Sequence, residues 1–343
     1  MMSKGKVMLA MSGGVDSSVS VILLKEAGYE VEGITMCLGD FSVVEKAQES
    51  AKHFGIKHHY VDLTTEFDRD VKDYFVEEYK NGRTPNPCVI CNKKVKLGKL
   101  FTEAEKIGFD YFATGHYANV VKVDDRYAIS KANFIPKDQS YVLYSLGQEV
   151  LSRLVLPLGG LSKEEVRAKG REMGLEAANQ KDSQDICFIP DGNYREFLAS
   201  RGLNNQPGNF VLKNGKVVGT HKGIANYTIG QRKGLGIAMG YPVFVTAIRP
   251  DKNEVEVGIA DDLLTTTMVV TDCNYQAIAD LTEPKEMEVK IRYKSPAVKG
   301  IVKPLPNNMA EVTFINPEKA VTPGQSAVFY NGDMVIGGGT ILK

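Results

Sequence analysis

Two cysteines, Cys88 and Cys91, stand three residues apart in the proline-containing segment Pro85 to Asn92, directly before a run of lysines. Neighbouring cations lower the pKa of a thiol and make it reactive. The two prolines predict an irregular segment rather than a helix. A structural zinc ion is the ordinary alternative for this spacing, but zinc takes four ligands and the chain has no second C-x-x-C pair. The pattern therefore favours thiols that take part in chemistry.

A third cysteine, Cys187, lies in the polar segment Asp182 to Phe188 and is the natural distant partner of this pair. The other two, Cys37 and Cys273, have apolar or turn-forming neighbours, and we expect them to be packed and inert. Five cysteines, an odd number in a chain whose start shows no secretion signal, indicate cytosolic thiols rather than a disulfide framework.

A glycine- and serine-rich segment, Ser12-Gly13-Gly14-Val15-Asp16-Ser17-Ser18, follows an apolar strand-like run and opens a helix-like one. Glycine flexibility, serine hydroxyls and helix N-terminal N–H groups meet there and can bind a polyanion. The lysine of a Walker loop and the spacing of a dinucleotide-binding loop are both missing. The segment instead matches the pyrophosphate loop of ATP pyrophosphatases, in which Asp16 would help to hold magnesium.

The elements that must position these residues alternate between strand and helix. Strands are predicted at about Val7–Met11, Tyr29–Met36, Ile56–Leu63 and Asp110–Thr114, and helices at about Ser17–Ala27 and Val43–Phe54. This alternation predicts a parallel sheet with helices on both faces. Ligands of such sheets bind outside the carboxyl ends of the strands, where the phosphate loop and Gly115-His116 both fall.

The rest of the chain changes character twice. A helix with a capping box is predicted from Ser162 to about Gly174, and a shorter one from Asn193 to Arg201. Alternating strands separated by turns such as Asn214-Gly215 and Asn331-Gly332 follow, and they predict one or two small β-barrels. The predicted strands are Phe210–Leu212, Val243–Ile248, Val255–Ile259, Glu288–Tyr293 and Ala310–Ile315. We expect a nucleotide-binding α/β domain over residues 1–150, a helical segment with Cys187 over 151–207, a central β domain over 208–270 and a C-terminal β-barrel over 271–343.

The 343 residues carry no formal net charge, but three acid-free stretches concentrate basic residues. Each stretch alone could be a solvated face, yet three of them favour a side that binds a polyanion. Their members are Lys80, Arg83, Lys93, Lys94, Lys96 and Lys99; Arg201, Lys213, Lys216, Lys222, Arg232, Lys233 and Arg249; and Lys290, Arg292, Lys294, Lys299 and Lys303. No apolar run approaches the roughly 18 residues of a membrane span, so we expect a cytoplasmic protein with no membrane partner.

Short motifs distributed in order along the whole chain resemble those of the tRNA-specific 2-thiouridylase family. They are Ser12 to Ser18, Asn86-Pro87-x-x-x-Cys91-Asn92, Ala113 to Tyr117, Lys137 to Tyr141, Asp182-Ser183, Ile186 to Ile189, Gly230 to Gly236 and Pro323 to Ser326. The resemblance implies an adenine-nucleotide α-hydrolase-like first domain and a tRNA-binding C-terminal barrel. It also implies ATP-dependent replacement of O2 by sulfur on the wobble uridine of tRNA, with ATP and Mg²⁺ as cosubstrate, release of AMP and pyrophosphate, and no permanently bound metal.

The resemblance also implies roles for single residues. Cys187 would carry a persulfide delivered by a cysteine desulfurase or a sulfur relay, and Cys91 would attack it, which leaves a disulfide between the two. The nucleotide is expected at Ala10, Met11, Ser12, Gly13, Gly14, Val15, Asp16, Ser17, Met36 and Gly115. The tRNA and its target base are expected at Asn86, Pro87, Cys88, His116, Lys137, Asp138, Gln139, Arg292, Tyr293 and Gln325. For His116, orientation of the activated base and an ordinary structural hydrogen bond remain alternatives.

One departure from the family opens a second mechanism. Cys88 stands where many relatives have aspartate, so an acid-base role cannot be carried over to it. Cys88, Cys91 and Cys187 also form a set of three thiols that could hold an iron–sulfur cluster with one open iron site. We favour the persulfide route. Another kind of ATP pyrophosphatase would not explain the cysteines, and an RNA-binding module without enzyme activity would not explain the phosphate loop.

Overall fold

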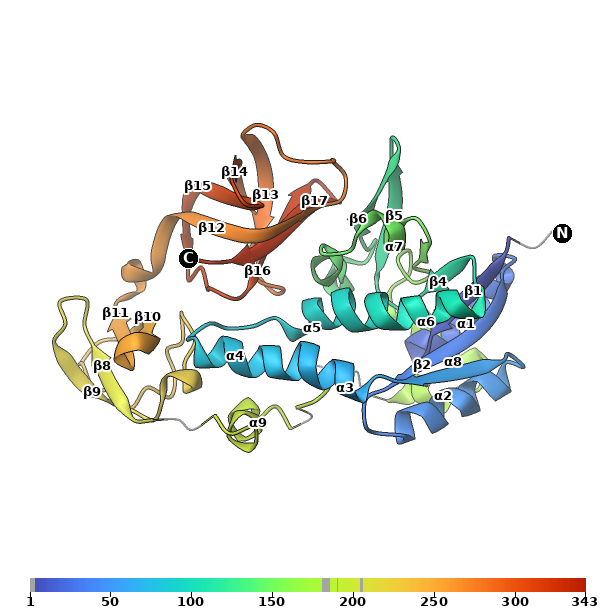
Figure 1. Ribbon diagram of the computed structural model, residues 1–343, viewed down its shortest axis with the longest axis horizontal. Coiled ribbons are helices and arrows are strands. Elements are labelled where there is room, and N and C mark those ends of the chain that lie inside the picture. The colour runs from blue at the N-terminus through green and yellow to red at the C-terminus, as the bar shows by residue number, and fades with distance from the viewer. Residues whose placement is uncertain (1–3, 181–185, 190, 204–205) are drawn as a thin grey trace.

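The computed structural model describes residues 4–180, 186–189, 191–203 and 206–343. Five parallel strands form a sheet in the order β3-β2-β1-β4-β7 at one end of the molecule (Figure 1). They are β1 (Lys6–Ala10), β2 (Glu30–Cys37), β3 (His58–Asp62), β4 (Tyr111–Ala113) and β7 (Leu154–Val155). The predicted parallel sheet is therefore confirmed, and its first four strands lie within the predicted ranges or within a residue of them.

Helices cover both faces of this sheet because successive side chains of a strand point to opposite sides. Val7 and Leu9 of β1 pack against α1 (Val15–Glu26) and α2 (Ser42–His53). Met8, between them, is buried on the other face with residues of α6 (Leu100–Ile107). The α/β fold class with helices on both faces is confirmed.

Two long helical stretches run between this sheet and the β-structures at the other end (Figure 1). The first joins α3 (Thr64–Phe67), a π-helical segment (Asp68–Asp73) and α4 (Tyr74–Lys80). The second joins α5 (Pro87–Ile90), a π-helical segment (Cys91–Lys99) and α6.

The second stretch corrects the prediction that prolines exclude a helix around the C-x-x-C pair. Pro87 occupies the first helical turn, where a missing N–H costs nothing. Asn86 caps the helix, its side-chain oxygen accepting a hydrogen bond from the Val89 N–H at 3.4 Å. Cys88 and Cys91 therefore stand on one helix, one turn apart.

Among its described residues, the middle of the chain contains a hairpin, several short 3₁₀ turns and three α-helices. The hairpin is β5 (Ala118–Val123) and β6 (Arg126–Lys131), and the helices are α7 (Gln148–Leu151), α8 (Lys163–Glu172) and α9 (Tyr194–Ser200). Short 3₁₀ turns lie at Ile135–Lys137, Ser140–Leu143 and Glu176–Asn179. The capping box predicted for α8 is present: Ser162 and Glu165 exchange hydrogen bonds in both directions.

The last 140 or so residues form two β-structures (Figure 1). A four-stranded sheet, ordered β10-β11-β8-β9, contains β8 (Gly208–Val211), β9 (Val217–His221), β10 (Phe244–Arg249) and β11 (Glu254–Gly258). The other strands are β12 (Leu264–Tyr275), β13 (Lys285–Lys290), β14 (Val298–Leu305), β15 (Met309–Lys319), β16 (Ser326–Asn331) and β17 (Met334–Ile341). These six close into an antiparallel barrel because β12 pairs with both β15 and β17. The predicted β-barrel is confirmed, although β13 ends before Arg292 and Tyr293.

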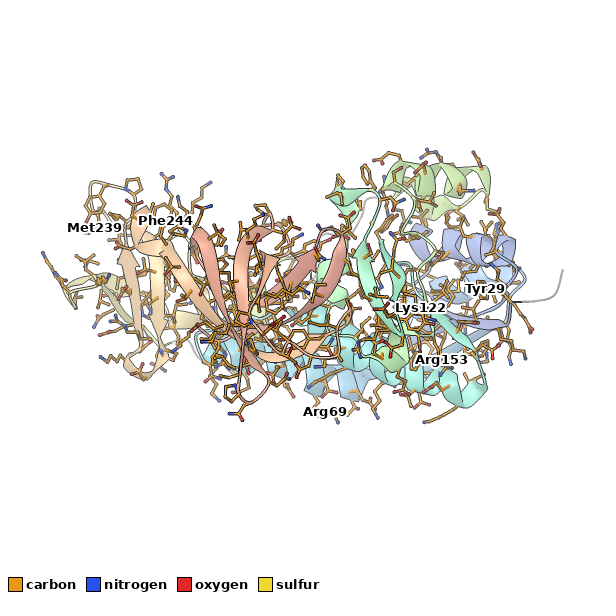
Figure 2. All side chains as sticks on the ribbon, turned by 90° about the horizontal axis from the view of Figure 1, so that it is seen from above. Tyr29, Arg69, Lys122, Arg153, Met239 and Phe244 are labelled. Carbon is orange, nitrogen blue, oxygen red and sulfur yellow. The ribbon has the colours of Figure 1, made fainter. Side chains whose placement is uncertain are left out.

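The barrel is tied to the N-terminal part of the chain. β17 pairs with β6 at Met334 and Ser130, so the hairpin extends the barrel sheet. In the view of Figure 2, the barrel lies between the four-stranded sheet of β8 to β11, near the labelled Phe244, and the β5–β6 hairpin, near the labelled Lys122. The amide of Gln276, which is fully buried, donates hydrogen bonds to the carbonyl oxygens of Leu143 and Tyr144. Within the described residues, no helix has both the length and the apolar character that a bilayer crossing needs.

Candidate active site

The Ser12–Ser18 segment connects β1 to α1 in the geometry of a phosphate-binding loop. Gly14 is the extended N-cap of α1, and within the described residues no side chain caps this helix. The N–H groups of its first turn are therefore not used by a side-chain cap, as anion binding requires. Gly13 has a φ of +74°, and a Cβ there would lie 2.7 Å from Lys46 Cβ, so only glycine fits.

The hydroxyl of Ser17 fixes the shape of this loop from inside. It accepts a hydrogen bond from the Ser12 N–H at 3.3 Å and donates one to the Gly14 carbonyl oxygen at 3.0 Å. Ser17 is also buried, with 5% of its surface exposed. The loop is thus held in one conformation before any ligand arrives, which reduces the entropy lost on binding.

The structure brings the other predicted nucleotide residues to this loop. The chain crosses from β3 to β4 on the far side of β1, so β1 and β4 flank the point where the strand order reverses, the usual ligand site of such sheets. A Cβ on Gly115 would lie 3.3 Å from the backbone carbon of Asp16. On the other side, Thr35, the neighbour of Met36, donates its hydroxyl to the Met11 carbonyl oxygen at 2.9 Å.

Asp16 has partners that the sequence did not reveal. Both of its carboxylate oxygens accept hydrogen bonds from the ammonium group of Lys163 at 2.8 Å, and one accepts the hydroxyl of Tyr117 at 2.7 Å. Lys163 is buried, with 6% of its surface exposed, although it lies 147 residues further along the chain. Its only sequence signal was its position at the capped start of a helix, which indicates nothing about the phosphate loop.

His116 is a buried, neutral side chain. Its Nδ1 lies 2.7 Å from the hydroxyl of Thr114, and 7% of its surface is exposed. Burial, and to a lesser degree the positive charge of Lys96, holds the pKa of His116 well below its usual value. The structural hydrogen bond considered for His116 is therefore present, and the lowered pKa leaves the imidazole neutral at neutral pH.

The three candidate thiols are neighbours, but they are not the acidic thiols that the sequence suggested. Burial raises the pKa of Cys91 to about 11 and raises the pKa values of Cys88 and Cys187 as well. The charge of Lys96 acts in the opposite direction on all three and is the smaller effect. The prediction that neighbouring lysines activate the thiols is therefore wrong in sign for this state, because desolvation outweighs the cation.

In the run of lysines that follows Cys91, Lys96 is the residue whose charge acts on the three thiols. It lies near all three thiols and near His116, whereas Lys94 of the same tract forms an ion pair with Asp70 at 3.9 Å. The sequence showed a run of lysines after the C-x-x-C pair but not which of them faces inward. Helical periodicity decides this, and the prolines had concealed the helix.

The helix that carries Cys88 and Cys91, formed by α5 and the π-helical segment after it, is called the cysteine helix below. Phe188, the residue after Cys187, holds Cys187 beside this helix. The ring of Phe188 packs edge-on against Phe67 and Phe75, with centroid distances of 5.7 and 5.5 Å. Phe67 and Phe75 lie in the first long helical stretch and are each 1% exposed. Cys187, like Cys88, is an exposed residue by surface area, although the protein packed around each thiol is enough to raise its pKa. Cys187 therefore lies at the surface while its backbone is anchored.

The iron–sulfur alternative needs three thiolates directed at one metal centre. All five cysteines are present as free thiols. Across the described residues, which include Cys88, Cys91 and Cys187, no set of three His, Cys, Asp or Glu side chains is arranged to hold a metal ion. The choice between a cluster and separate thiols therefore stays a prediction.

Several residues expected to bind tRNA make their hydrogen bonds within the protein. The carboxylate of Asp138 accepts bonds from the N–H groups of Ala132 and Ser140, and its carbonyl oxygen accepts the hydroxyl of Tyr293 at 3.1 Å. Gln139 accepts the Tyr117 N–H at 2.9 Å. Asp138, Gln139 and Tyr293 therefore form a junction between the hairpin region and the barrel.

Arg292 is likewise engaged inside the protein. Its guanidinium donates to the carbonyl oxygens of Ile229 and Ala320 and to the hydroxyl of Thr322. Burial lowers the pKa of Arg292 from its usual value. Arg292 therefore joins the segment before β10 to the barrel, and a contact with tRNA stays a prediction.

The basic stretches are less uniform in space than in sequence. Arg201 pairs with Asp68 at 2.8 Å, Arg249 pairs with Glu256, and Lys299 pairs with Glu286 at 3.2 Å. Burial lowers the pKa of Lys290. The acid-free stretches therefore receive carboxylates from elsewhere in the fold, and the charge available to a polyanion is smaller than the sequence count.

Three families match the chain in succession. Residues 5–191 match the tRNA methyl transferase HUP domain, residues 195–259 the tRNA methyl transferase PRC-barrel domain, and residues 265–341 the aminomethyltransferase beta-barrel domain. The first match alone covers more than half of the chain.

Full-length relatives have a more specific description. The tRNA-specific 2-thiouridylase MnmA 1 of Clostridium botulinum is 46% identical over 355 residues, which covers 99% of this chain and 100% of the relative. The tRNA-specific 2-thiouridylase MnmA 2 of Clostridium tetani is 46% identical over 353 residues, covering 98% and 99%. A crystal structure of a 4-thiouridine synthetase–RNA complex with bound ATP aligns over 57% of this chain and 50% of its own, at 21% identity and a TM-score of 0.37, which supports no functional inference.

Proposed function

The chain belongs to the tRNA-specific 2-thiouridylase family, and from this premise we propose that it is an ATP-dependent tRNA-uridine 2-sulfurtransferase acting on the wobble uridine. One observation carries the proposal beyond family membership. The charge of Lys96 acts on the three thiols and on His116, and Gly115, the neighbour of His116, packs against Asp16 of the phosphate loop. ATP activation and sulfur delivery can therefore act on one base.

We propose that the loop residues bind the phosphates of ATP. The uracil O2 attacks the α-phosphorus, the bond to the β-phosphate breaks, and pyrophosphate leaves toward the N–H groups at the start of α1. Mg²⁺ keeps several waters and uses one or two carboxylates together with substrate phosphates. Asp16 supplies one carboxylate, whose oxygens are bonded to Lys163 in this structure, so an ion held there would share or replace that contact. Such an ion would neutralise charge on the departing pyrophosphate.

Sulfur transfer then uses the two thiols in different roles. Cys187 carries the persulfide, and the thiolate of Cys91 attacks the Cys187 sulfur, so that a disulfide forms and hydrosulfide leaves with the electrons of the broken S–S bond. Hydrosulfide attacks C2 of the adenylated base and AMP departs. A cellular thiol must then reduce the disulfide by two electrons before another turnover. Because the pKa of Cys91 is raised, substrate binding must bring this thiol closer to its thiolate form.

The tRNA and a sulfur-donor protein are the proposed partners. We propose that residues 1–150 bind ATP, 151–207 present Cys187, 208–270 act as a connecting β domain and 271–343 bind tRNA. A cysteine desulfurase or a sulfur relay would load Cys187, whose exposed position suits delivery by another protein. Five free thiols suit a reducing compartment, and we propose the cytoplasm.

The proposal is tested by incubating the purified protein with ATP, unmodified tRNA and a persulfide donor. Pyrophosphate release should depend on added tRNA, and 2-thiouridine should appear in the recovered tRNA when the donor is present. Release of pyrophosphate without tRNA would instead favour another ATP pyrophosphatase. Binding of tRNA with no pyrophosphate release under any condition would favour an RNA-binding module.

A further inference from the structure

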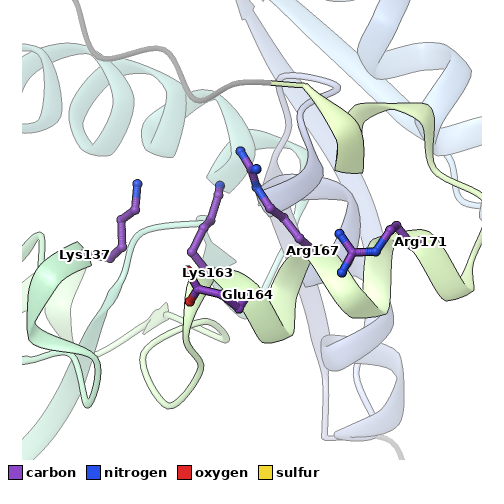
Figure 3. Close-up of a pocket in the computed structure, with 5 residues that line it drawn as sticks. All are labelled: Lys137, Lys163, Glu164, Arg167 and Arg171. Atoms are coloured by element: carbon purple, nitrogen blue, oxygen red, sulfur yellow. The ribbon is translucent and has the colours of Figure 1, made fainter.

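Two cations of α8, on one side of the phosphate loop, already have partners inside the protein. Lys163 and Arg167 line a pocket beside this loop and follow one another along α8 (Figure 3). The ammonium group of Lys163 is bonded to both carboxylate oxygens of Asp16. Arg167 donates a hydrogen bond to the Gln180 carbonyl oxygen at 2.8 Å. These two charges are therefore engaged by the protein itself.

Helix α2 lies directly against the phosphate loop and presents a different lysine to it. A Cβ on Gly13 would lie 2.7 Å from the Cβ of Lys46, 2.8 Å from its carbonyl carbon and 2.9 Å from its carbonyl oxygen. One helical turn further along α2, the hydroxyl oxygen of Ser50 lies 2.8 Å from that of Ser18 in α1. Residues four apart share one face of a helix. The face of α2 that carries Lys46 and Ser50 is therefore the face turned to the loop and to α1.

The side chain of Lys46 extends toward the edge of the sheet at which ligands of such folds bind. Side chains of an α-helix lean toward its N-terminus, and α2 begins just after the short loop at the carboxyl end of β2. Hydrogen bonds from Ser42 are the main cause that lowers the pKa of Asp40 in this loop, and the charge of Lys46 is a smaller one. The ammonium group of Lys46 is therefore directed to the carboxyl side of the sheet, beside the phosphate loop.

Lys46 has the accessibility that a ligand-binding cation needs. It is an exposed residue, and within the described part of the chain it forms no ion pair. The loop itself lacks the lysine with which a Walker loop reaches the β- and γ-phosphates. We infer that Lys46 supplies this charge from the neighbouring helix, its ammonium group binding the outer phosphates of ATP that leave as pyrophosphate. Naming ATP rests on the proposed function, whereas the position of Lys46 against the loop does not.

The test compares two lysines of the same helix. Lys46→Met removes the cation beside the loop, and Lys46→Arg keeps a cation there. Lys52→Met is the matched control, because Lys52 is exposed in the last turn of α2 and lies about 9 Å further along the helix axis. ATP and inorganic pyrophosphate are titrated separately into each purified protein by calorimetry, with Mg²⁺ and without tRNA, at two salt concentrations.

Lys46→Met should weaken the binding of both probes by about tenfold or more, the loss expected for a hydrogen bond between charged groups. The difference from the parent protein should shrink at the higher salt concentration, because salt screens an exposed charge. Lys52→Met and Lys46→Arg should stay close to the parent protein. Weaker binding of ATP alone would contradict the inference, since Lys46 would then serve another part of the nucleotide.

The remaining outcomes separate this inference from the proposed function. Equal affinities of Lys46→Met and Lys52→Met for both probes would overturn the inference and leave the proposed function standing. A parent protein that binds neither probe would overturn both. If ATP affinity depends on Lys46 but pyrophosphate is never released with tRNA, the proposed function fails and the inference stands.

Discussion

The side-chain amide of Gln325, in the barrel, donates a hydrogen bond to the carbonyl oxygen of Thr84 at 2.9 Å, just before the cysteine helix. The same amide reaches the Pro85 carbonyl oxygen at 3.1 Å, and the Thr84 N–H donates to the Pro323 carbonyl oxygen at 2.9 Å. Gly324, between the two barrel residues, has a φ of +90°, and a Cβ there would lie 2.9 Å from the Thr84 oxygen. The barrel therefore sets where the cysteine helix begins.

Removing this contact should impair sulfur transfer more than ATP binding. Gln325→Ala loses two hydrogen bonds to the segment before Asn86, together worth about 1–3 kcal/mol, so we expect single-turnover thiolation to slow by about tenfold. ATP affinity, measured by calorimetry, should change by less than about twofold, because the phosphate loop does not touch this junction. A Gln325→Ala enzyme with normal thiolation would show that the cysteine helix is positioned without the barrel.

The ion pair between Asp16 and Lys163 gives a prediction for the first chemical step. Asp16→Asn removes the charge that holds Lys163 and any ion bound with the pyrophosphate, so tRNA-dependent pyrophosphate release should fall by about 100-fold or more, the scale of lost charge stabilisation. Affinity for tRNA should be retained, because the carboxylate is bonded to Lys163 and Tyr117 beside the phosphate loop and carries no positive charge that could bind RNA phosphates. Filter binding of tRNA run beside the pyrophosphate assay checks both parts. Undiminished release would remove Asp16 from the mechanism.

Substitutions of the cysteines should distinguish the adenylation step from the sulfur-delivery step. Cys91→Ser and Cys187→Ser should each abolish thiolation while pyrophosphate is still released once per bound tRNA, because adenylation precedes sulfur transfer. The matched controls are Cys37→Ala and Cys273→Ala, two buried thiols that should leave thiolation intact. Quantification of 2-thiouridine and of pyrophosphate in the same reaction distinguishes the steps. Normal thiolation by Cys187→Ser would refute both the persulfide and the cluster mechanisms.

Cys88→Ser decides between those two mechanisms. Under the persulfide route the variant should keep most of its activity, since Cys88 exchanges no sulfur. A three-thiolate cluster would lose a ligand, most of its iron and its activity. Anaerobic purification followed by iron and sulfide analysis of both proteins provides the readout, and an inactive, iron-depleted Cys88→Ser enzyme would contradict the mechanism preferred here.

The raised pKa of Cys91 predicts a pH dependence of sulfur transfer. A thiol with a pKa of about 11 is almost entirely protonated at neutral pH, and its thiolate fraction rises about tenfold per pH unit below the pKa. Single-turnover sulfur transfer, started from the loaded Cys187 persulfide, should therefore accelerate with pH between neutrality and mild alkalinity. Lys96→Met removes the cation that opposes this shift and should slow the reaction further at each pH. A flat profile would mean that Cys91 is already ionised in the complex with tRNA.

A prediction for tRNA binding follows from which basic residues remain exposed. Lys294 is exposed beside Tyr293, whereas Lys290 is partly buried and Arg292 bonds within the protein. Lys294→Glu should weaken tRNA binding and, if it contacts phosphate, reduce the slope of log affinity against log salt by about one. Lys52→Glu, an exposed charge reversal on α2, serves as the control. Equal affinities for the two variants would show that this face of the barrel lies away from the tRNA.

The sequence by itself determined the parallel sheet, the phosphate loop and the β-rich end. Each depends on local patterns, namely alternation of apolar residues, turn residues and the glycines that a loop between strand and helix requires. The cysteine helix was missed for a local reason as well. Proline is read as a helix breaker, but at the first helical turn it lacks only an N–H that would have had no partner.

Only the tertiary structure decided how the chemical groups affect one another. Lys163 reaches Asp16 across 147 residues, and Gln325 reaches Thr84 across 241. The sign of the thiol pKa shift depended on burial, which no count of neighbouring lysines contains. The sequence states which chemical groups are present and how far apart they stand along the chain. The desolvation of each group and its hydrogen-bond partners depend on what the fold packs around that group. In this protein, desolvation and hydrogen bonding decide which cations act on the site.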